Sequence, residues 1–330
     1  MLNLYKLLFF MMLVLGTLIS ISSFSWLGMW IGLEINLLSM IPLLMTNSPR
    51  SSEASMKYFI VQALASTIMM FSMILMFYYS SSLTLIIQNL IFDMSMFTKM
   101  GAAPFHFWLP EVVQGISWMN CMIMLTWQKI SPIILLAYTD LNLKFTIIVI
   151  IFSMTIGGIM GINQTSLRKV LAYSSISHIG WMVSTLLSNM SNLIIYIFIY
   201  SLITFNITVT FSKMNLHNIN QLMMFSNQSK LMKLSFSLNF LALGGLPPTM
   251  GFFPKWIIIN TLTTMNMYLL SFFMIIMSLL TLYFYIKILF TSIILINSEI
   301  KNKSMIWSNS LFILISAFGL FFSTSILNVT

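Results

Sequence analysis

Charged residues are scarce in this sequence, where Asp, Glu, Lys and Arg together make up 6% of the 330 residues. The chain also has one cysteine, Cys121, and three histidines. A single cysteine excludes an internal disulfide and an iron–sulfur cluster held by cysteines of this chain alone. No glycine-rich phosphate loop or dinucleotide-binding fingerprint precedes a predicted helix. We therefore expect no redox centre, nucleotide site or metal site within the chain.

Apolar residues dominate instead, with 59% of residues hydrophobic and a mean hydropathy of +0.97. Runs of about 20 apolar residues recur, each long enough to cross a hydrocarbon layer of roughly 30 Å. The sequence predicts an all-α polytopic membrane protein with about eleven transmembrane helices and no soluble domain. The first helix is expected to be retained, since no clear cleavage site follows it. The predicted helices cover residues 4–20, 25–45, 57–79, 83–110, 117–138, 145–161, 170–188, 192–212, 233–260, 265–294 and 305–326.

Basic residues test this helix count, because Lys and Arg collect on one side of a membrane protein. In an eleven-helix chain only Lys144 falls on the second side, while Lys99, Lys129 and Lys255 lie within helices. The net charge of +9 is thus a signal of topology and gives no reason to expect a nucleic acid partner. The other basic residues fall on the first side: Lys6, Arg50, Lys57, Arg168, Lys169, Lys213, Lys230, Lys233, Lys301 and Lys303, with Lys287 able to extend towards it.

Two of the predicted helices, 83–110 and 233–260, are expected to be broken. Each contains glycine, clustered proline and one lysine, in the segments Lys99-Met-Gly-Ala-Ala-Pro-Phe-His-Phe-Trp-Leu-Pro-Glu and Gly244-Gly-Leu-Pro-Pro-Thr-Met-Gly-Phe-Phe-Pro-Lys-Trp. Proline removes a helical donor and clashes with the preceding turn, so the first helix should break around Gly101 to Pro104 and leave carbonyls unpaired. Broken backbone at bilayer depth is tolerated only where protein or water satisfies those carbonyls.

The broken helices also suggest an internal repeat. Each is the fourth helix in a block of five, and two blocks with an odd number of helices cross the membrane in opposite senses. This is the inverted repeat of secondary transporters, whose discontinuous helices lie near the substrate path. We expect the first repeat over residues 1–140, the second over 141–296 and an extra C-terminal helix within 297–330.

The ionisable residues at bilayer depth are the candidate functional residues, because such groups are costly there and usually functional. Glu34 lies at the middle of the second predicted helix, with Lys99 as its expected partner. Three of the candidate residues also have a simpler interpretation. Lys99 could form a static ion pair, Lys255 could extend to a membrane surface, and His178 could be a packing histidine. The predicted proton relay comprises Glu34, Lys99, Lys129, Lys255 and His178, whereas Asp93 does not share a helix face with Lys99 and has no assigned role.

Several segments resemble the antiporter-like membrane subunits of respiratory complex I in their animal mitochondrial form. They are the two proline-rich segments above, Thr126-Trp-Gln-Lys-Ile-Ser-Pro, Leu171-Ala-Tyr-Ser-Ser-Ile-Ser-His-Ile-Gly-Trp and Trp30-Ile-Gly-Leu-Glu-Ile-Asn. The resemblance covers most of the chain and implies the inverted five-helix repeats of that family. The family's membrane glutamate and three lysines fall on Glu34, Lys99, Lys129 and Lys255.

The resemblance also implies a function: proton pumping across the mitochondrial inner membrane, coupled to electron transfer from NADH to ubiquinone. The basic side would face the matrix, with the N-terminus there and the C-terminus on the intermembrane-space side. FMN, iron–sulfur clusters and ubiquinone would belong to other subunits. The partners would be membrane lipids and other membrane-arm subunits, including neighbouring antiporter-like ones. Two alternatives remain open: a structural membrane-arm subunit without its own proton path, and a stand-alone cation/proton antiporter.

Overall fold

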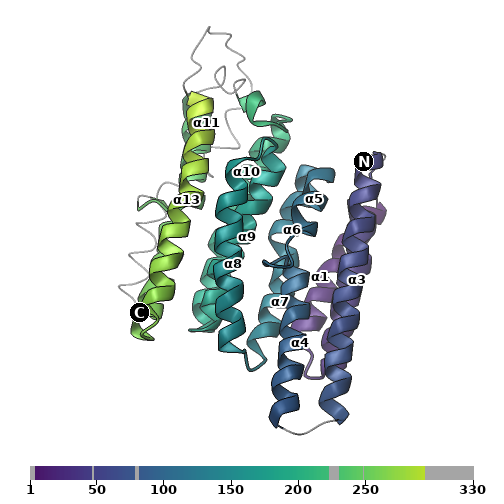
Figure 1. Ribbon diagram of the computed structural model, residues 1–330. Helices are drawn as coiled ribbons and strands as arrows, with labels where there is room; N and C mark the ends of the chain where they lie inside the picture. The colour runs from purple at the N-terminus through teal and green to yellow at the C-terminus, as the bar shows by residue number, and fades with distance from the viewer. Residues whose placement is uncertain (1–3, 47, 79–81, 223–229, 248, 294–330) are drawn as a thin grey trace. The chain divides into compact units, whose positions relative to one another are not determined.

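The computed structural model describes residues 4–46, 48–78, 82–222, 230–247 and 249–293, and every regular element within these ranges is a helix (Figure 1). Seven spans in the described ranges are long and apolar enough to cross a membrane. The predicted helix over residues 305–326 lies outside the described residues. The helices are α1 (Leu4–Ser22), α2 (Trp26–Leu44), α3 (Pro49–Tyr78), α4 (Ser82–Met100), α5 (Trp108–Gly115), α6 (Trp118–Leu125), α7 (Trp127–Ala137), α8 (Leu143–Ile162), α9 (Leu167–Leu186), α10 (Met190–Lys213), α11 (Lys230–Gly244), α12 (Phe252–Thr264) and α13 (Tyr268–Ile293).

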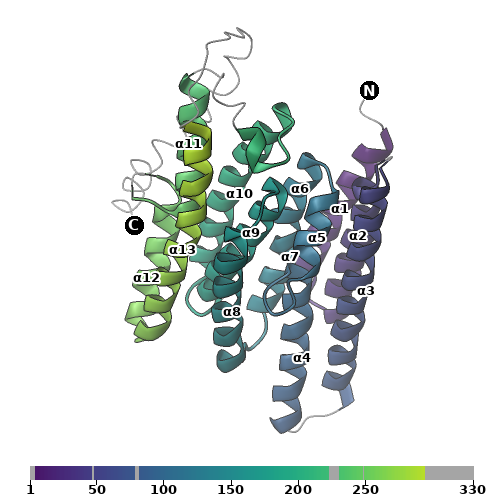
Figure 2. The same cartoon turned by 45° about the horizontal axis from the view of Figure 1, so that its top comes forward.

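The helices form two compact units, Met1–Ser153 and Met154–Thr330. In the first unit α1 packs along α2, α3 packs against α2, α4 and α5, and α7 contacts α1, α4 and α6 (Figure 2). In the second unit α11 packs against α10 and α13, while α12 contacts α9, α10 and α13. Each unit therefore contains one of the two predicted broken helices, as α4 with α5 and as α11 with α12.

Glycines allow α1 and α2 to approach closely. A Cβ atom placed on Gly32 would lie 2.5 Å from the backbone nitrogen of Ser20 and 2.8 Å from the carbonyl oxygen of Gly16. Both of these atoms belong to the backbone and cannot move aside cheaply. Small residues at such positions let membrane helices gain packing contacts that larger residues would prevent.

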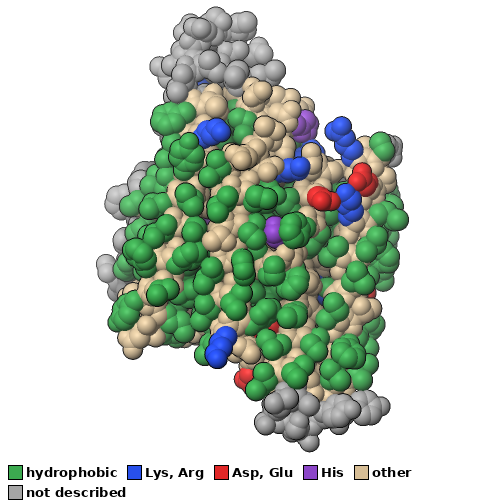
Figure 3. All heavy atoms as spheres, in the orientation of Figure 1, with side chains coloured by type: hydrophobic (Ala, Val, Ile, Leu, Met, Phe, Trp, Pro, Cys, Tyr) green, Lys and Arg blue, Asp and Glu red, His purple; other side chains and the backbone are tan. Residues whose placement is uncertain are grey.

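Large apolar side chains remain exposed on the outer surfaces of the helices. Leu64, Phe198 and Phe272 keep 59%, 63% and 65% of their surface exposed. Hydrophobic side chains cover most of the visible face, and charged ones are few (Figure 3). In water such surfaces would cause association, whereas hydrocarbon is a suitable solvent for them. The surface thus agrees with the predicted membrane-spanning class.

Two predicted helices differ from the observed ones. The third begins at Pro49 rather than at residue 57. The fifth, expected to run continuously from 117 to 138, is divided at Thr126 into α6 and α7. The Thr126 hydroxyl donates to the carbonyl of Met122 (2.7 Å), and the Lys129 amide bonds only three residues back, to Thr126 (3.3 Å). A hydroxyl bonded to the i−4 carbonyl bends helices, which accounts for the interruption.

Candidate functional site

The first break lies where the sequence predicts it. α4 ends at Met100, and Gly101 adopts a left-handed φ of 75°. The Gly101 amide donates to the carbonyl of Thr98 (3.1 Å) and the Ala102 amide to that of Phe97 (3.0 Å). This pair of bonds is the Schellman motif, which ends helices at a glycine because glycine tolerates positive φ.

Side chains satisfy the carbonyls that the break exposes. The indole of Trp108 donates to the carbonyl oxygen of Thr98 (3.0 Å), and the Gln62 amide donates to that of Lys99 (3.2 Å). His106 Nδ1 lies 3.3 Å from the carbonyl oxygen of Pro104, so His106 also supports the broken backbone. Protein groups therefore meet the requirement for irregular backbone at membrane depth.

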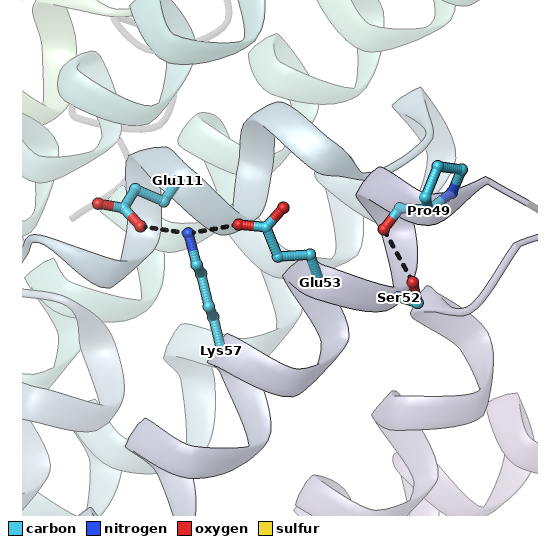
Figure 4. Close-up of polar contacts among 5 residues, drawn as sticks. All are labelled: Pro49, Ser52, Glu53, Lys57 and Glu111. Atoms are coloured by element: carbon cyan, nitrogen blue, oxygen red, sulfur yellow. Dashed lines mark hydrogen bonds and ion pairs between the residues drawn. The ribbon is translucent and has the colours of Figure 1, made fainter.

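Lys99 lies in the last turn of α4 and is only 5% exposed. The carboxylate of Glu34, on α2, stabilises its ammonium electrostatically. The ion pairs closer than 4 Å between described residues are elsewhere, at the surface, where Lys57 bridges Glu53 and Glu111 at 2.9 Å each (Figure 4). Glu34 and Lys99 thus interact at longer range than a direct ion pair.

A polar chain that the sequence did not reveal lies beside Lys129 in the first unit. The Gln128 amide donates to Oδ1 of Asn36 (2.8 Å), and the Tyr58 hydroxyl donates to Oε1 of Gln128 (3.4 Å). These residues come from α7, α2 and α3, and Lys129 itself is 2% exposed. The signal that could have identified them is the presence of amides within apolar helices, because such groups need partners there. The chain joins α7, α2 and α3 at the residue that precedes the buried lysine.

The second break repeats the geometry of the first. α11 ends at Gly244, Gly245 has φ of 81°, and its amide donates to the carbonyl of Ala242 (3.1 Å). The Leu246 amide donates to the carbonyl of Leu241 (3.2 Å), which completes a second Schellman motif. α12 then begins close to the end of α11, since a Cβ on Gly251 would collide with the Ala242 carbonyl.

Lys255 lies on α12 but reaches back to the end of α11. Its Nζ donates to the carbonyl oxygens of Gly244 (2.9 Å) and Leu243 (3.2 Å), and it lies 5.7 Å from the ring centre of Trp181. The residue is 7% exposed, so it does not extend to a surface. The carbonyl end of a helix carries partial negative charge, and an aromatic face attracts cations. The surroundings of Lys255 therefore suit an ammonium group.

His178, on α9, lies in the same unit as Lys255. Its Nδ1 is 2.7 Å from the Tyr196 hydroxyl, and both residues border a small cavity of about 10 Å³ that Leu243 also lines. That is room for roughly one water molecule. The hydroxyls of Ser174, Ser175 and Ser177, close to His178 in sequence, donate to backbone carbonyls of their own helix at 2.7–2.8 Å. Their lone pairs can accept a hydrogen bond but their protons are engaged.

The predicted relay residues thus fall into two sets, one in each unit. Glu34 and Lys99 interact in the first unit, which also buries Lys129, while His178 and Lys255 approach the end of α11 in the second. No group of three or more His, Cys, Asp or Glu residues that could hold a metal ion occurs in the part of the chain that the structure describes.

Comparisons with known proteins show the family to which the chain belongs. The family model described as "NADH:quinone oxidoreductase/Mrp antiporter, TM" matches residues 23–281. NADH-ubiquinone oxidoreductase chain 2 of Anopheles gambiae is 45% identical over 307 residues, covering 92% of this chain and 89% of that protein. The Locusta migratoria protein of the same name is 41% identical over 330 residues, covering 96% of each chain.

The fold is also similar to that of a solved structure. A chain of respiratory complex I from Thermus thermophilus superposes with a TM-score of 0.86 at 23% identity, covering 96% of this chain and 78% of that chain. The apolar helices and these relatives identify an integral, multi-pass membrane protein of a respiratory complex. The chain belongs to the NADH:quinone oxidoreductase/Mrp antiporter membrane family, and within it to the NADH-ubiquinone oxidoreductase chain 2 proteins.

Proposed function

We propose that this chain is the antiporter-like subunit of respiratory complex I that moves protons through buried ionisable residues. The observation that carries the proposal is that each unit buries a lysine beside a helix break, at 5% exposure for Lys99 and 7% for Lys255. Such groups at membrane depth are costly, and in this family they accompany an NADH:ubiquinone oxidoreductase. The chain acts as one subunit of that enzyme and contains no redox centre of its own.

The full topology comprises eleven transmembrane helices, arranged as inverted repeats over 1–140 and 141–296 with an extra helix in 297–330. The two matching Schellman motifs, at Gly101 and Gly245, support the repeat. The chain lies in the mitochondrial inner membrane with its N-terminus and its basic side on the matrix side, and its C-terminus faces the intermembrane space. Its partners are the other membrane-arm subunits, including neighbouring antiporter-like ones, and membrane lipids. FMN, iron–sulfur clusters and ubiquinone belong to other subunits.

In the proposed mechanism, quinone reduction elsewhere in the complex changes the protonation of this chain's residues. Glu34 controls the charge of Lys99, Lys129 connects the two halves, His178 passes protons through water, and Lys255 controls release. Moving one charge against 100 mV costs about 2.3 kcal/mol, which corresponds to about a 50-fold change in a protonation equilibrium. Forming or losing one favourable charge interaction at a buried site is of this size. Modest rearrangements could therefore control such a relay.

The test replaces the buried ammonium groups in the assembled complex. Lys99→Met and Lys255→Met keep most of the side-chain length, and Lys6→Met, at an exposed residue of α1, is the matched control. Complexes are reconstituted into vesicles, and protons pumped per quinone reduced are measured. We expect both buried variants to lower this ratio and the control to leave it unchanged.

Two results would contradict the proposal. Unchanged pumping in both buried variants would favour a structural subunit without its own proton path. Purification of the chain alone, without the other subunits and with cation/proton exchange activity, would favour a stand-alone antiporter.

A further inference from the structure

The carboxyl group of Asp93 has no role in the relay described above. Asp93 lies on α4 and is 0% exposed. Neither of its oxygens has a partner at strict hydrogen-bond geometry, although the backbone amide of Asn142 is near enough to act as a weak donor to the carboxyl. An ionised carboxylate buried without a cationic partner is costly, so burial favours the neutral acid over the carboxylate.

Neighbouring residues on the same face of α4 show where this carboxyl points. One turn before Asp93, the side-chain amide of Asn89 donates to the backbone carbonyl oxygen of Asp140 (3.4 Å). One turn after it, the ring of Phe97 lies 5.7 Å from that of Phe145 on α8. Residues four apart share a helix face, so Asp93 lies beneath the connection between α7 and α8.

That connection leads from the buried acid to the surface. Asp140 and Lys144 are exposed and Asn142 is partly exposed. Asp93 also lies six residues nearer the start of α4 than Lys99, a rise of about 9 Å. The carboxyl is therefore between the buried lysine and a surface at the opposite end of α4 from the helix break.

The other ionisable groups on the elements around α4 make no ion pair with Asp93. α4 packs against α3 and α7, and single ring contacts join it to α2, through Trp26 and Phe92, and to α8. The groups on these elements and on α4 itself are Glu34 on α2, Arg50, Glu53, Lys57, Tyr58 and Tyr78 on α3, Lys99 on α4, Lys129 on α7, Tyr138 and Asp140 in the connection, and Lys144 in the first turn of α8.

We propose that Asp93 is a further proton-binding residue of the first unit, which transfers protons between Lys99 and the surface at Asp140 to Lys144. The neutral acid first releases its proton to water at the connection and becomes a carboxylate. A proton from the Lys99 ammonium then reaches this carboxylate through intervening water, leaving a neutral amine and restoring the neutral acid. The high cost of the buried carboxylate drives its reprotonation. The proposal rests on the proposed function of the chain.

The test measures the protonation of this group directly in the assembled complex. Infrared spectra are recorded for the unmodified complex and for Asp93→Asn, Asp93→Glu and the exposed control Asp140→Asn. We expect Asp93→Asn to lose one C=O stretching band of a protonated carboxylic acid, Asp93→Glu to shift that band, and the control to retain it. In vesicles, Asp93→Asn should lower the protons pumped per quinone reduced, and Asp93→Glu should restore them.

The outcomes separate this proposal from the function on which it rests. Loss of pumping in Lys99→Met together with normal pumping and an unchanged acid band in Asp93→Asn overturns the role of Asp93 alone. Normal pumping in both Lys99→Met and Lys255→Met overturns the proposed function, while the infrared band still reports whether Asp93 is protonated. If Asp93→Asn does not assemble, the Asp93→Glu spectrum decides, because an unshifted band means that residue 93 is not the protonated acid.

Discussion

Gly245→Ala should displace the Lys255 ammonium from the end of α11. The residue has φ of 81°, where alanine costs about 1–2 kcal/mol. The added Cβ would also lie 2.8 Å from Cδ and 3.0 Å from Nζ of Lys255. The flexible lysine would move away and lose its bonds to Gly244 and Leu243, which as charge-assisted hydrogen bonds contribute about 1.5–3 kcal/mol. The backbone strain and the lost hydrogen bonds together should destabilise the end of α11 by about 3 kcal/mol or more.

Hydrogen exchange in the assembled complex measures this loss at the site itself. The reporting amides are those of Gly245 and Leu246, whose bonds to Ala242 and Leu241 close the end of α11. A loss of about 3 kcal/mol should speed their exchange by more than about 100-fold. Gly158→Ala is the control, because its Cβ would meet Leu280, Met277 and Thr281 at ordinary contact distances of 3.5–3.9 Å and alanine favours a helix.

A double-mutant cycle separates the two contributions to this loss. In a Lys255→Ala background, Gly245→Ala should cost only the backbone strain of about 1–2 kcal/mol. The difference between the two backgrounds is the energy that couples the glycine to the ammonium. If Gly245→Ala accelerates exchange equally in both backgrounds, the glycine does not serve to make room for Lys255, and the reasoning is refuted.

Three further predictions concern other parts of the chain. Glu34→Gln should lower the charged fraction of Lys99 and slow coupled quinone reduction; undiminished turnover and pumping in the assembled complex would contradict it. Gly32→Ala should separate α1 from α2 and cost about 1–3 kcal/mol, seen as a lower melting temperature of the complex than for Gly158→Ala. Partial burial lowers the pKa of His217, and the Arg168 guanidinium, 3.3 Å from its Nδ1, lowers it further. Protonation therefore favours the opened loop, so the protection factor of the Leu167 amide, which bonds to the His217 carbonyl, should fall as the pH drops below about 6.5 and stay constant above it, once exchange rates are corrected for their intrinsic dependence on pH.

The two helix breaks could be predicted from sequence because their cause is local. Glycine tolerates the positive φ seen at Gly101 and Gly245, and the prolines that follow cannot continue a helix. The burial of Lys99 and Lys129 could likewise be predicted, since both lie within long apolar runs. The helix count and the inverted repeats stay predictions, because the last predicted helix is outside the described residues.

Contacts between distant parts of the chain could not be predicted. Gln128 bonds Asn36 across 92 positions and Tyr58 across 70, and no local pattern specifies such pairing. At Thr126 the helix is interrupted where a hydroxyl donates to a carbonyl of its own helix. Many buried Ser and Thr hydroxyls make the same kind of bond in helices that stay continuous, so the sequence does not reveal which one marks an interruption. The position of Lys255 on a helix could be predicted, but the direction of its side chain, which determines its partners, could not.

Lys99 and Lys255, the two lysines beside the helix breaks, lie in similar chemical environments, but the charge of each depends on a different motion. Both belong to the carbonyl end of the first half of a broken helix, where the partial negative charge favours an ammonium. Lys99 is part of that half-helix and moves with it, so its charge responds to the distance of Glu34. Lys255 reaches the same kind of helix end from the second half, so any shift of α12 against α11 changes its bonds to Gly244 and Leu243. Within a relay, the charge of Lys99 would then respond to protonation at a neighbouring helix, whereas that of Lys255 would respond to the geometry of its own break.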